Sequence, residues 1–411
     1  MTTSTTYLIA GASLAGAKAA EALRGEGFDG PLVMVGAERE RPYERPPLSK
    51  DYLLGKAERE TVYVHPPQWY AEHDVDLRLG VAVTAVHPSA HEVSLADGSR
   101  IGYAKLLLTT GSSPRRLSVP GAGLDGVLYL RNLGDSDRIK AAFQSSSKVA
   151  VIGAGWIGLE TAAAARAAGL EVTVLEMAEL PLLRVLGRQV AQVFATLHRD
   201  HGVDLRCGVQ VAEITGSNGK ADGVLLADGS RIDADVIITG VGITPNSQLA
   251  AAAGLDISNG IRVDAQLRSS NPDIYAAGDV ANAFHPLLGK HIRVEHWANA
   301  LHQPQAAARA MLGQDVAYDR VPYFFTDQYD LGMEYSGYVE PDGYDEVVFR
   351  GDTGGREFIA FWLSGGQVLA GMNVNVWDVN DAIQGLVRDG RPVDKDALQD
   401  PERRLESLTD R

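Results

Sequence analysis

Two glycine-rich segments of the same pattern, G-x-x-x-x-G, constrain the fold of this chain more than any other feature. One spans residues 11–16 (GASLAG) after an apolar run at residues 7–10, and the other spans residues 153–158 (GAGWIG) after an apolar run at residues 148–152. Each run is typical of a buried strand, and each glycine segment leads into residues that favour a helix. A strand, a tight turn and a helix N-terminus together bind phosphate, because the N–H groups of the first helical turn are unpaired. We therefore predict an α/β chain with two dinucleotide-binding βαβ units.

The second glycine segment fits the fingerprint at every position. Gly153 makes the turn, Gly155 lets the backbone approach a pyrophosphate, and Gly158 lets the helix pack closely on the strand. A β-rich run then ends in Glu176, near the spacing of about 20 residues at which an acid hydrogen-bonds a ribose 2′-hydroxyl. A carboxylate there would repel a 2′-phosphate, so we predict NADH rather than NADPH at this unit.

The first glycine segment departs from the fingerprint at its centre. Gly11 and Gly16 hold the outer positions, but Ser13 replaces the middle glycine and adds bulk together with a hydroxyl donor. The acid after the next predicted strand is Glu38, which comes later than usual. Two dinucleotide units in one chain favour a flavin paired with a nicotinamide, because hydride passes directly from one ring to the other.

Composition excludes several classes of function. The net charge of −15 argues against nonspecific binding to nucleic acid or to an anionic membrane, both of which need a basic surface. The single cysteine, Cys207, excludes an intrachain disulfide and a dithiol relay, and the pair His198 and His201 lacks further ligands for a metal. No apolar run reaches about 18 residues, and the first six residues lack the pattern of a signal peptide. We expect a cytoplasmic protein with no metal site.

The chain contains an internal duplication. A β-rich stretch follows each βαβ pattern, at residues 77–110 and 203–240, and each stretch is closed by a Thr-Gly pair. The tetrapeptide Asp-Gly-Ser-Arg occurs in both stretches, at residues 97–100 and 228–231. Such a repeat indicates one structural unit used twice, and it explains why one chain holds two fingerprints.

Composition changes near residue 321, where an aromatic segment begins. Three later runs are predicted as antiparallel strands, and residues 379–388 are predicted as a helix. Before that change, a strand-like run ends in Gly278 and Asp279, which can offer a backbone N–H and a carboxylate to a polar ligand group. We predict an FAD-type domain formed by residues 1–112 and 245–320, an NADH domain of residues 113–244, and a C-terminal α+β domain of residues 321–411.

With these features, the chain resembles the bacterial ferredoxin and rubredoxin reductases, the putidaredoxin-reductase group of flavoproteins. The most telling segments are residues 42–50 (PYERPPLSK) and residues 327–329 (DQY), and the resemblance extends from Tyr7 to about Arg391. It implies two Rossmann-like dinucleotide-binding domains of the glutathione-reductase type plus an α+β C-terminal domain. It also implies FAD on the first unit, NADH on the second, and a [2Fe–2S] ferredoxin or a rubredoxin as the partner.

The resemblance also implies which residues contact the two cofactors. The family usually has an acid directly after the glycine at position 36, whereas this chain has Ala37 there and Glu38 next. The residues implied for FAD are Gly11, Ser13, Leu14, Ala15, Gly16, Glu38, Arg45, Lys50, Val83, Arg131, Gly278, Asp279 and Trp297. The residues implied for NADH are Gly153, Gly155, Trp156, Ile157, Gly158, Glu160 and Glu176.

The activity that the resemblance implies is NADH:ferredoxin oxidoreductase, in which the ferredoxin feeds an oxygenase. Lys50 and Glu160 are the implied catalytic residues: Lys50 favours the negative charge of reduced flavin, and Glu160 pairs with Lys50 or orients the nicotinamide amide. A flavin-dependent NADH oxidase or peroxidase is an alternative, although such enzymes use a cysteine near the first unit's second strand, where this chain has none. An NADH-binding signalling flavoprotein resembling apoptosis-inducing factor is a third possibility, disfavoured by the absence of a targeting segment and of basic DNA-binding character.

The lone cysteine provides a first test. We expect Cys207→Ser to leave NADH-dependent electron transfer nearly unchanged, because a dithiol relay needs two cysteines and this chain has one. Steady-state turnover and thermal unfolding of the variant would be compared with those of the parent protein. A large loss of turnover in a variant that still folds would contradict the absence of thiol chemistry.

Overall fold

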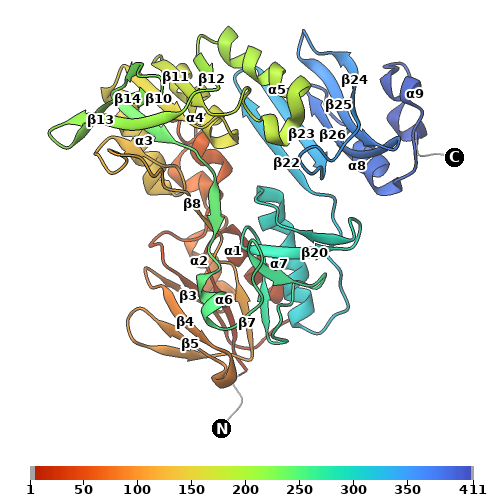
Figure 1. Ribbon diagram of the computed structural model, residues 1–411. Helices are drawn as coiled ribbons and strands as arrows, with labels where there is room; N and C mark the ends of the chain where they lie inside the picture. Colours follow the sequence, from red (N-terminus) through yellow and green to blue (C-terminus); the bar gives the residue numbers. More distant parts are fainter. Residues whose placement is uncertain (1–4, 409–411) are drawn as a thin grey trace. The chain divides into compact units, whose positions relative to one another are not determined.

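The computed structural model describes residues 5–408, which form two compact units (Figure 1). The first unit holds the chain up to Arg45, then Arg59–Ser113 and Ile243–Arg320; the second holds Pro46–Glu58, Pro114–Gly242 and the chain from Val321 onward. Residues 1–4, on which the expectation about a signal peptide partly rests, and residues 409–411 lie outside the described residues. The division into three domains stays a prediction.

A five-stranded parallel sheet forms the centre of the first unit. The strand predicted before the first glycine segment is β1 (Tyr7–Ala10), which pairs in parallel with β2 on one side and β7 on the other. The helix after it, α1 (Leu14–Gly25), buries small side chains and packs against α7 (Trp297–Met311). The sheet has the order β3-β2-β1-β7-β19, with the further bounds β2 (Leu32–Gly36), β3 (Val75–Leu79), β7 (Lys105–Leu108) and β19 (Ile274–Ala276).

Smaller elements complete the first unit. Two three-stranded sheets and two short helices accompany the parallel sheet, and a two-stranded ladder forms where the chain leaves the unit and returns. The three-stranded sheets are β4 (Val83–His87), β5 (Glu92–Leu95) and β6 (Arg100–Gly102), and β18 (Ile261–Val263), β20 (Ala281–His285) and β21 (Lys290–Ile292). The short α-helices are α2 (Pro67–Glu72) and α6 (Gln248–Ala252), and the ladder pairs β8 (Ser112–Pro114) with β17 (Ile243–Pro245).

The second unit repeats the parallel sheet of the first. The second glycine segment lies between β10 (Lys148–Ile152) and α4 (Trp156–Ala167), and β11 (Glu171–Glu176) follows. The order β12-β11-β10-β16-β9 matches β3-β2-β1-β7-β19 position by position, and all the pairings of both sheets are parallel. The other strands are β9 (Val127–Leu128), β12 (Asp204–Cys207) and β16 (Val236–Thr239), and the other helices are α3 (Leu133–Ser145) and α5 (Leu183–Asp200).

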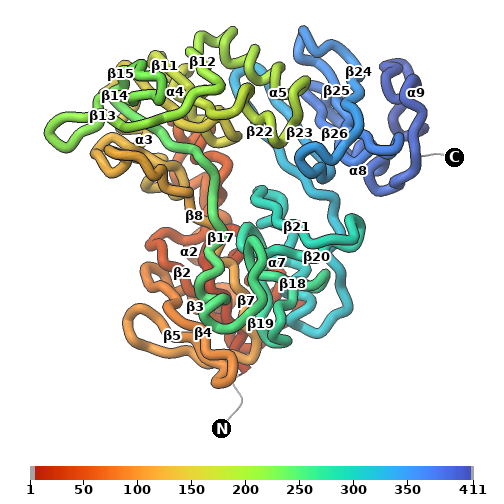
Figure 2. Tube along the Cα trace, in the orientation of Figure 1, coloured from red at the N-terminus to blue at the C-terminus, as the bar shows by residue number. Residues whose placement is uncertain are grey.

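The duplication predicted from the sequence extends to single hydrogen bonds. Figure 2 shows the antiparallel strands β13 (Val211–Ser217), β14 (Lys220–Leu226) and β15 (Arg231–Asp233), which correspond to β4, β5 and β6. In the turn of the first copy, the backbone N–H of Ser99 donates to Asp97 Oδ1 at 2.9 Å and its hydroxyl donates to the same atom at 2.6 Å. Ser230 and Asp228 make the same two bonds at the same two distances in the second copy.

A five-stranded antiparallel sheet forms the C-terminal part of the second unit. The three strands predicted there are present, and so is the predicted helix, which is α8 (Asn380–Asp389). The aromatic segment forms a strand as well, and the strand after it was not anticipated. The order is β22 (Tyr323–Gln328), β23 (Leu331–Gly337), β26 (Gln367–Val374), β25 (Glu357–Ser364) and β24 (Glu346–Asp352), with the short helix α9 (Lys395–Gln399) beyond.

One hydrophobic core joins the parallel sheet and the C-terminal sheet of the second unit. The ring of Trp156 lies 5.1 Å from that of Phe324, Phe324 stacks on Tyr335 at 4.9 Å, and Tyr335 lies 5.3 Å from Trp362, measured between ring centroids. Trp362 Nε1 donates at 3.1 Å to the carbonyl oxygen of Leu186, beside the break that a positive φ introduces into α5 at the following glycine. Because the core is continuous, the C-terminal sheet helps to shape the surroundings of α4.

Among residues 5–408, no helix is both long enough and apolar enough to cross a membrane.

Candidate functional site

The outer glycines of the first segment are required by backbone packing. Gly11 has φ of +130°, and a Cβ atom there would lie 2.3 Å from the carbonyl oxygen of Thr109. A Cβ at Gly16 would lie 2.1 Å from the carbonyl oxygen of Gly11. The turn therefore lies too close to the residue after β7, and α1 too close to the turn, for any side chain at these two positions, as the fingerprint predicts.

The N-terminus of α1 offers donors beside a carboxylate. Ser13 is the N-cap residue, with an extended backbone (φ −121°) and no capping bond from its hydroxyl; Leu14 and Ala15 follow it and are buried. Gly278 comes close to this turn, since a Cβ on it would lie 3.3 Å from the Cβ of Ala15. The helix N-terminus and the Gly278–Asp279 turn thus lie together at the end of the first sheet, as expected of a site for phosphate and polar groups.

Asp279 lies among polar and charged neighbours of the first unit. The Ser112 hydroxyl donates to Asp279 Oδ2 at 2.8 Å, and Gln303 accepts from the backbone N–H of Gly278 at 2.9 Å. The pKa of Arg45 is raised even though burial opposes it, because Tyr43, Glu38 and Asp279 favour the charged guanidinium. Burial lowers the pKa of His296, next to Trp297, to about 4, with Asp279 opposing the shift.

The remaining candidates of the first unit have defined partners. Glu38 accepts from the hydroxyl of Tyr43 at 2.5 Å and pairs with Arg45 at 3.3 Å, so its carboxylate is held at the end of β2. Trp297, the first residue of α7, donates through Nε1 to Glu44 at 2.9 Å and is partly exposed. Val83 begins β4 and is partly exposed. None of these contacts by itself shows a ligand, so the assignment of these residues to FAD remains a proposal.

The second glycine segment contains two tightly packed glycines and one that faces open space. A Cβ at Gly153 would lie 2.4 Å from the carbonyl oxygen of Gly240, and one at Gly158 would lie 2.0 Å from that of Gly153. Gly155 has an ordinary φ of −79°, is exposed, and would have no atom within 4 Å of an added Cβ. Packing explains Gly153 and Gly158, whereas at Gly155 the open space fits the approach of a pyrophosphate.

Glu176 is held in place by backbone donors. The N–H of Ala154, inside the glycine segment, donates to Glu176 Oε2 at 2.7 Å, and the N–H of Ala178 donates to Oε1 at 2.8 Å. Each carboxylate oxygen can accept more than one bond, so acceptor capacity is left for the hydroxyls of a ribose. The acid at the end of β11 is therefore oriented before any nucleotide arrives.

Trp156 and Ile157 differ in what their side chains do. The ring of Trp156 packs against Phe194 and Phe324 with centroids 5.5 Å and 5.1 Å away, so its side chain belongs largely to the core. Ile157, the second residue of α4, is 44% exposed. If Trp156 contacts a nucleotide, the backbone at the start of α4 is the better candidate for that contact.

Lys50 and Glu160 meet in the second unit although 110 residues separate them. Lys50 Nζ donates to Glu160 Oε1 at 2.6 Å, and Glu160 is only 6% exposed. The hydroxyls of Ser49 and Thr326 donate to Oε2 and Oε1 of the same carboxylate, each at 2.5 Å. A buried carboxylate with three donors is stabilised as the anion, which suits the pairing expected from the sequence. Its catalytic role stays a prediction.

Two residues of this cluster were missed by the sequence analysis. Ser49 precedes Lys50 in the segment that carried the resemblance, and Thr326 precedes the Asp-Gln-Tyr triplet. Their proximity to those segments was the only signal available. The backbone N–H of Arg131 donates to Asp135 Oδ2 at 2.9 Å at the start of α3, and its place near the cofactor stays a prediction.

The histidines and the cysteine considered in the sequence analysis are packed against other parts of the protein. Within residues 5–408, no group of three or more His, Cys, Asp or Glu side chains is arranged to hold a metal ion. His198 is fully buried against Gln328, and His201 stacks on Tyr329 with ring centroids 3.9 Å apart. Burial raises the pKa of Cys207, which disfavours a reactive thiolate.

Sequence comparison with known families decides the affiliation of the chain. Residues 5–304 match the family described as "Pyridine nucleotide-disulphide oxidoreductase", and residues 323–409 match the one described as "Reductase C-terminal". The chain belongs to the pyridine nucleotide-disulphide oxidoreductase family. The predicted fold class is thereby confirmed, although the single cysteine leaves this family member without an intrachain dithiol.

Relatives within this family match the chain almost end to end. The anthranilate 1,2-dioxygenase system ferredoxin–NAD(+) reductase component of Burkholderia cepacia is 40% identical over 96% of this chain and 97% of its own length. Putidaredoxin reductase of Pseudomonas putida is 37% identical over 96% of this chain and 94% of its own. The crystal structure of a covalent putidaredoxin reductase–putidaredoxin complex matches with a TM-score of 0.94 and 37% identity, covering 99% of this chain and 98% of that one. The resemblance to this group of reductases is confirmed.

The two kinds of glycine in this family member give a matched pair of variants. We expect Gly158→Ala to destabilise the fold by about 1–3 kcal/mol, because the new methyl group meets the Gly153 carbonyl. Gly155→Ala should keep most of the stability, because its methyl group points into open space. It should weaken binding of NADH, because we expect the pyrophosphate to occupy that space. Thermal unfolding and a binding titration would be run on both variants. Equal loss of stability in the two would show that Gly155 also serves packing.

Proposed function

We propose that this chain is an FAD-dependent NADH:ferredoxin oxidoreductase. The observation that carries the proposal is the pair of dinucleotide-binding folds, each with a packed glycine turn and an acid at or just after the end of its second strand. The end-to-end similarity to reductases named for ferredoxin and putidaredoxin supports it. The partner would be a [2Fe–2S] ferredoxin or a rubredoxin that passes electrons to an oxygenase, and the enzyme would act in the cytoplasm without binding nucleic acid or membrane.

The residues of the first unit fit FAD. The uncapped N-terminus of α1 suits the pyrophosphate, Glu38 lies where an adenosine ribose is expected, and Asp279 suits the ribityl hydroxyls. The further residues proposed for FAD in this unit are Gly11, Leu14, Ala15, Gly16, Arg45, Val83, Gly278 and Trp297; Lys50 and Arg131, which the resemblance also implies for FAD, belong to the second unit. When bound, FAD supplies the chemistry that no side chain of the protein can: it takes two electrons as hydride and gives them up singly.

The residues of the second unit fit NADH. The N-terminus of α4 and the open space at Gly155 suit the pyrophosphate, and Glu176 suits the adenosine ribose. Glu160 and Lys50 are proposed as the catalytic pair. Lys50 supplies a positive charge that favours anionic reduced flavin, and Glu160 holds the ammonium group and orients the nicotinamide amide. No side chain acts as a nucleophile in this scheme.

The alternatives considered from the sequence receive less support. An oxidase or peroxidase of the cysteine-dependent kind would need a reactive thiol near β2, and the one cysteine of the chain lies in β12. A signalling flavoprotein resembling apoptosis-inducing factor would use a basic surface to bind DNA, whereas this chain carries a net charge of −15.

The proposal is tested by spectroscopy and electron transfer. Protein reconstituted with FAD should show flavin absorbance, NADH should bleach it, and a [2Fe–2S] ferredoxin should then be reduced faster than oxygen. Stopped-flow absorbance follows each step separately. Absence of flavin bands after reconstitution, or reduction of oxygen at the rate of ferredoxin, would contradict the proposal.

A second experiment tests the choice of nicotinamide. We expect a higher kcat/KM for NADH than for NADPH, because the Glu176 carboxylate bonds a 2′-hydroxyl and repels a 2′-phosphate. Glu176→Arg should shrink that preference by about tenfold or more, the scale of one hydrogen bond to a charged group. Glu176→Gln is the control, since it removes the charge and keeps an acceptor for a backbone N–H. Equal kcat/KM values for the two nucleotides in the parent protein would refute the assignment.

A further inference from the structure

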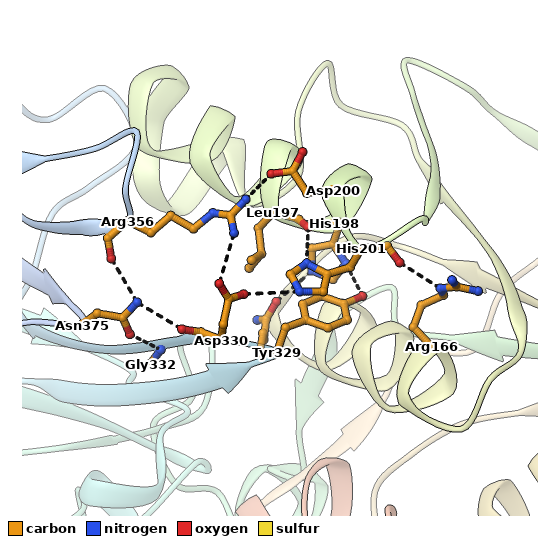
Figure 3. A network of polar contacts seen from close by, with 11 residues as sticks. Arg166, Leu197, His198, Asp200, His201, Tyr329, Asp330, Gly332, Arg356 and Asn375 are labelled. Carbon is orange, nitrogen blue, oxygen red and sulfur yellow. Dashed lines mark hydrogen bonds and ion pairs between the residues drawn. The ribbon is translucent and has the colours of Figure 1, made fainter.

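A line of buried side chains connects Glu160 to the far end of strand β22. The Thr326 hydroxyl donates to Glu160 Oε1 at 2.5 Å, and Gln328 Nε2 donates to Thr326 Oγ1 at 3.3 Å. Gln328 Oε1 lies 2.8 Å from Nε2 of His198, and the Tyr329 hydroxyl lies 3.3 Å from His198 Nδ1. Figure 3 shows the outer part of this line, where His198 and Tyr329 lie beside His201.

Strand alternation and helix α5 place these groups. Thr326 and Gln328 are two residues apart on β22, so both face the core with Phe324, while Asp327 between them faces outward. His198 comes from α5 and is fully buried, as Thr326 and Gln328 are nearly so. Because water is excluded from the line, each of these polar groups depends on its protein partner.

The hydrogen bonds of the line have one consistent direction. An ionised Glu160 only accepts, so the single proton of Thr326 is committed to it and Thr326 must accept from Gln328. The amide then turns its oxygen to His198, which must donate through Nε2–H. Burial lowers the pKa of His198 to about 4, so the ring is neutral at pH 7 and its Nδ1 accepts from the Tyr329 hydroxyl.

From this geometry we propose that Gln328 and His198 are positioning residues for Glu160. They fix the proton of Thr326 toward the carboxylate, and so hold Glu160 in the orientation in which it also accepts from Lys50 and Ser49. This inference rests on the proposed function, since it assigns Gln328 and His198 to the NADH half of the reaction. Neither residue touches substrate in this scheme; both act through Thr326.

The first test separates the two half-reactions. Gln328→Met keeps the volume but removes the amide, and it should lower the rate constant for flavin reduction by NADH about fivefold, the effect of one hydrogen bond between neutral groups. Reoxidation of the reduced flavin by ferricyanide should not change. The matched control is Gln192→Met on the same helix as His198, because Gln192 is exposed and also donates to a threonine, at 3.4 Å.

A double-mutant cycle tests whether the effect passes through Thr326. In a Thr326→Val background, the hydroxyl through which Gln328 acts is gone. Gln328→Met should then change the flavin-reduction rate by less than about twofold, which is the scatter expected between two mutations that do not interact. His198→Gln retains a donor near the Nε2 position and should preserve most of the rate, whereas His198→Leu should lose it. Additive effects of Gln328→Met and Thr326→Val, or equal rates for the two His198 variants, would overturn the inference.

A measurement without turnover completes the test. Nitrogen-15 NMR of the histidine rings should show His198 as the Nε2–H tautomer at pH 7, with the signal assigned by its loss in His198→Gln. An Nδ1–H tautomer would overturn the inference whatever the kinetics show. Failure of NADH to reduce the parent protein would instead overturn the proposed function, so the two failures are distinguishable.

Discussion

The buried carboxylate of Glu160 is the constraint on which the organisation of the second unit depends. An anion with so little exposure is costly unless donors surround it, and removing one partner of such a pair leaves an uncompensated charge. Its three donors come from two segments: Ser49 and Lys50 from Pro46–Glu58, and Thr326 from β22. These segments therefore have to fold together with α4, even though more than 100 residues separate each of them from Glu160 in sequence.

Because the chain contains the same fold twice, comparing the two copies shows which glycines are required by packing and which position is free to suit a ligand. None of the outer glycines of the two segments can be replaced by alanine without a clash, because the new methyl group would meet a backbone carbonyl oxygen at about the same distance in each copy. The central position is different: Ser13 and Gly155 both have backbone angles open to any residue. Packing thus fixes four glycines, and the choice of serine or glycine between them is left to the nucleotide that each unit binds.

The C-terminal sheet takes part in the second unit's site through its core. Phe324, Thr326 and Gln328 share one face of β22, so the strand that packs on Trp156 also delivers a hydroxyl to Glu160. The aromatic contact of Phe324 and the hydrogen bond of Thr326 hold the same strand at two points, so each contact helps to fix where the strand presents the other side chain. The C-terminal sheet therefore both packs against α4 and supplies a hydrogen-bond donor to Glu160.

The sequence alone determined the local parts of this protein. Apolar runs, glycine turns and the acid Glu176 predicted both βαβ units, and short runs after residue 340 predicted three strands and α8, because these signals depend on neighbours within a few residues. The sequence did not reveal that Ser49 and Thr326 bind Glu160, that the Trp156 ring packs in the core, or that Gln328 and His198 lie behind Thr326. Those contacts join elements far apart in the chain, and only the tertiary packing of β22, α4 and α5 brings their side chains within hydrogen-bonding distance.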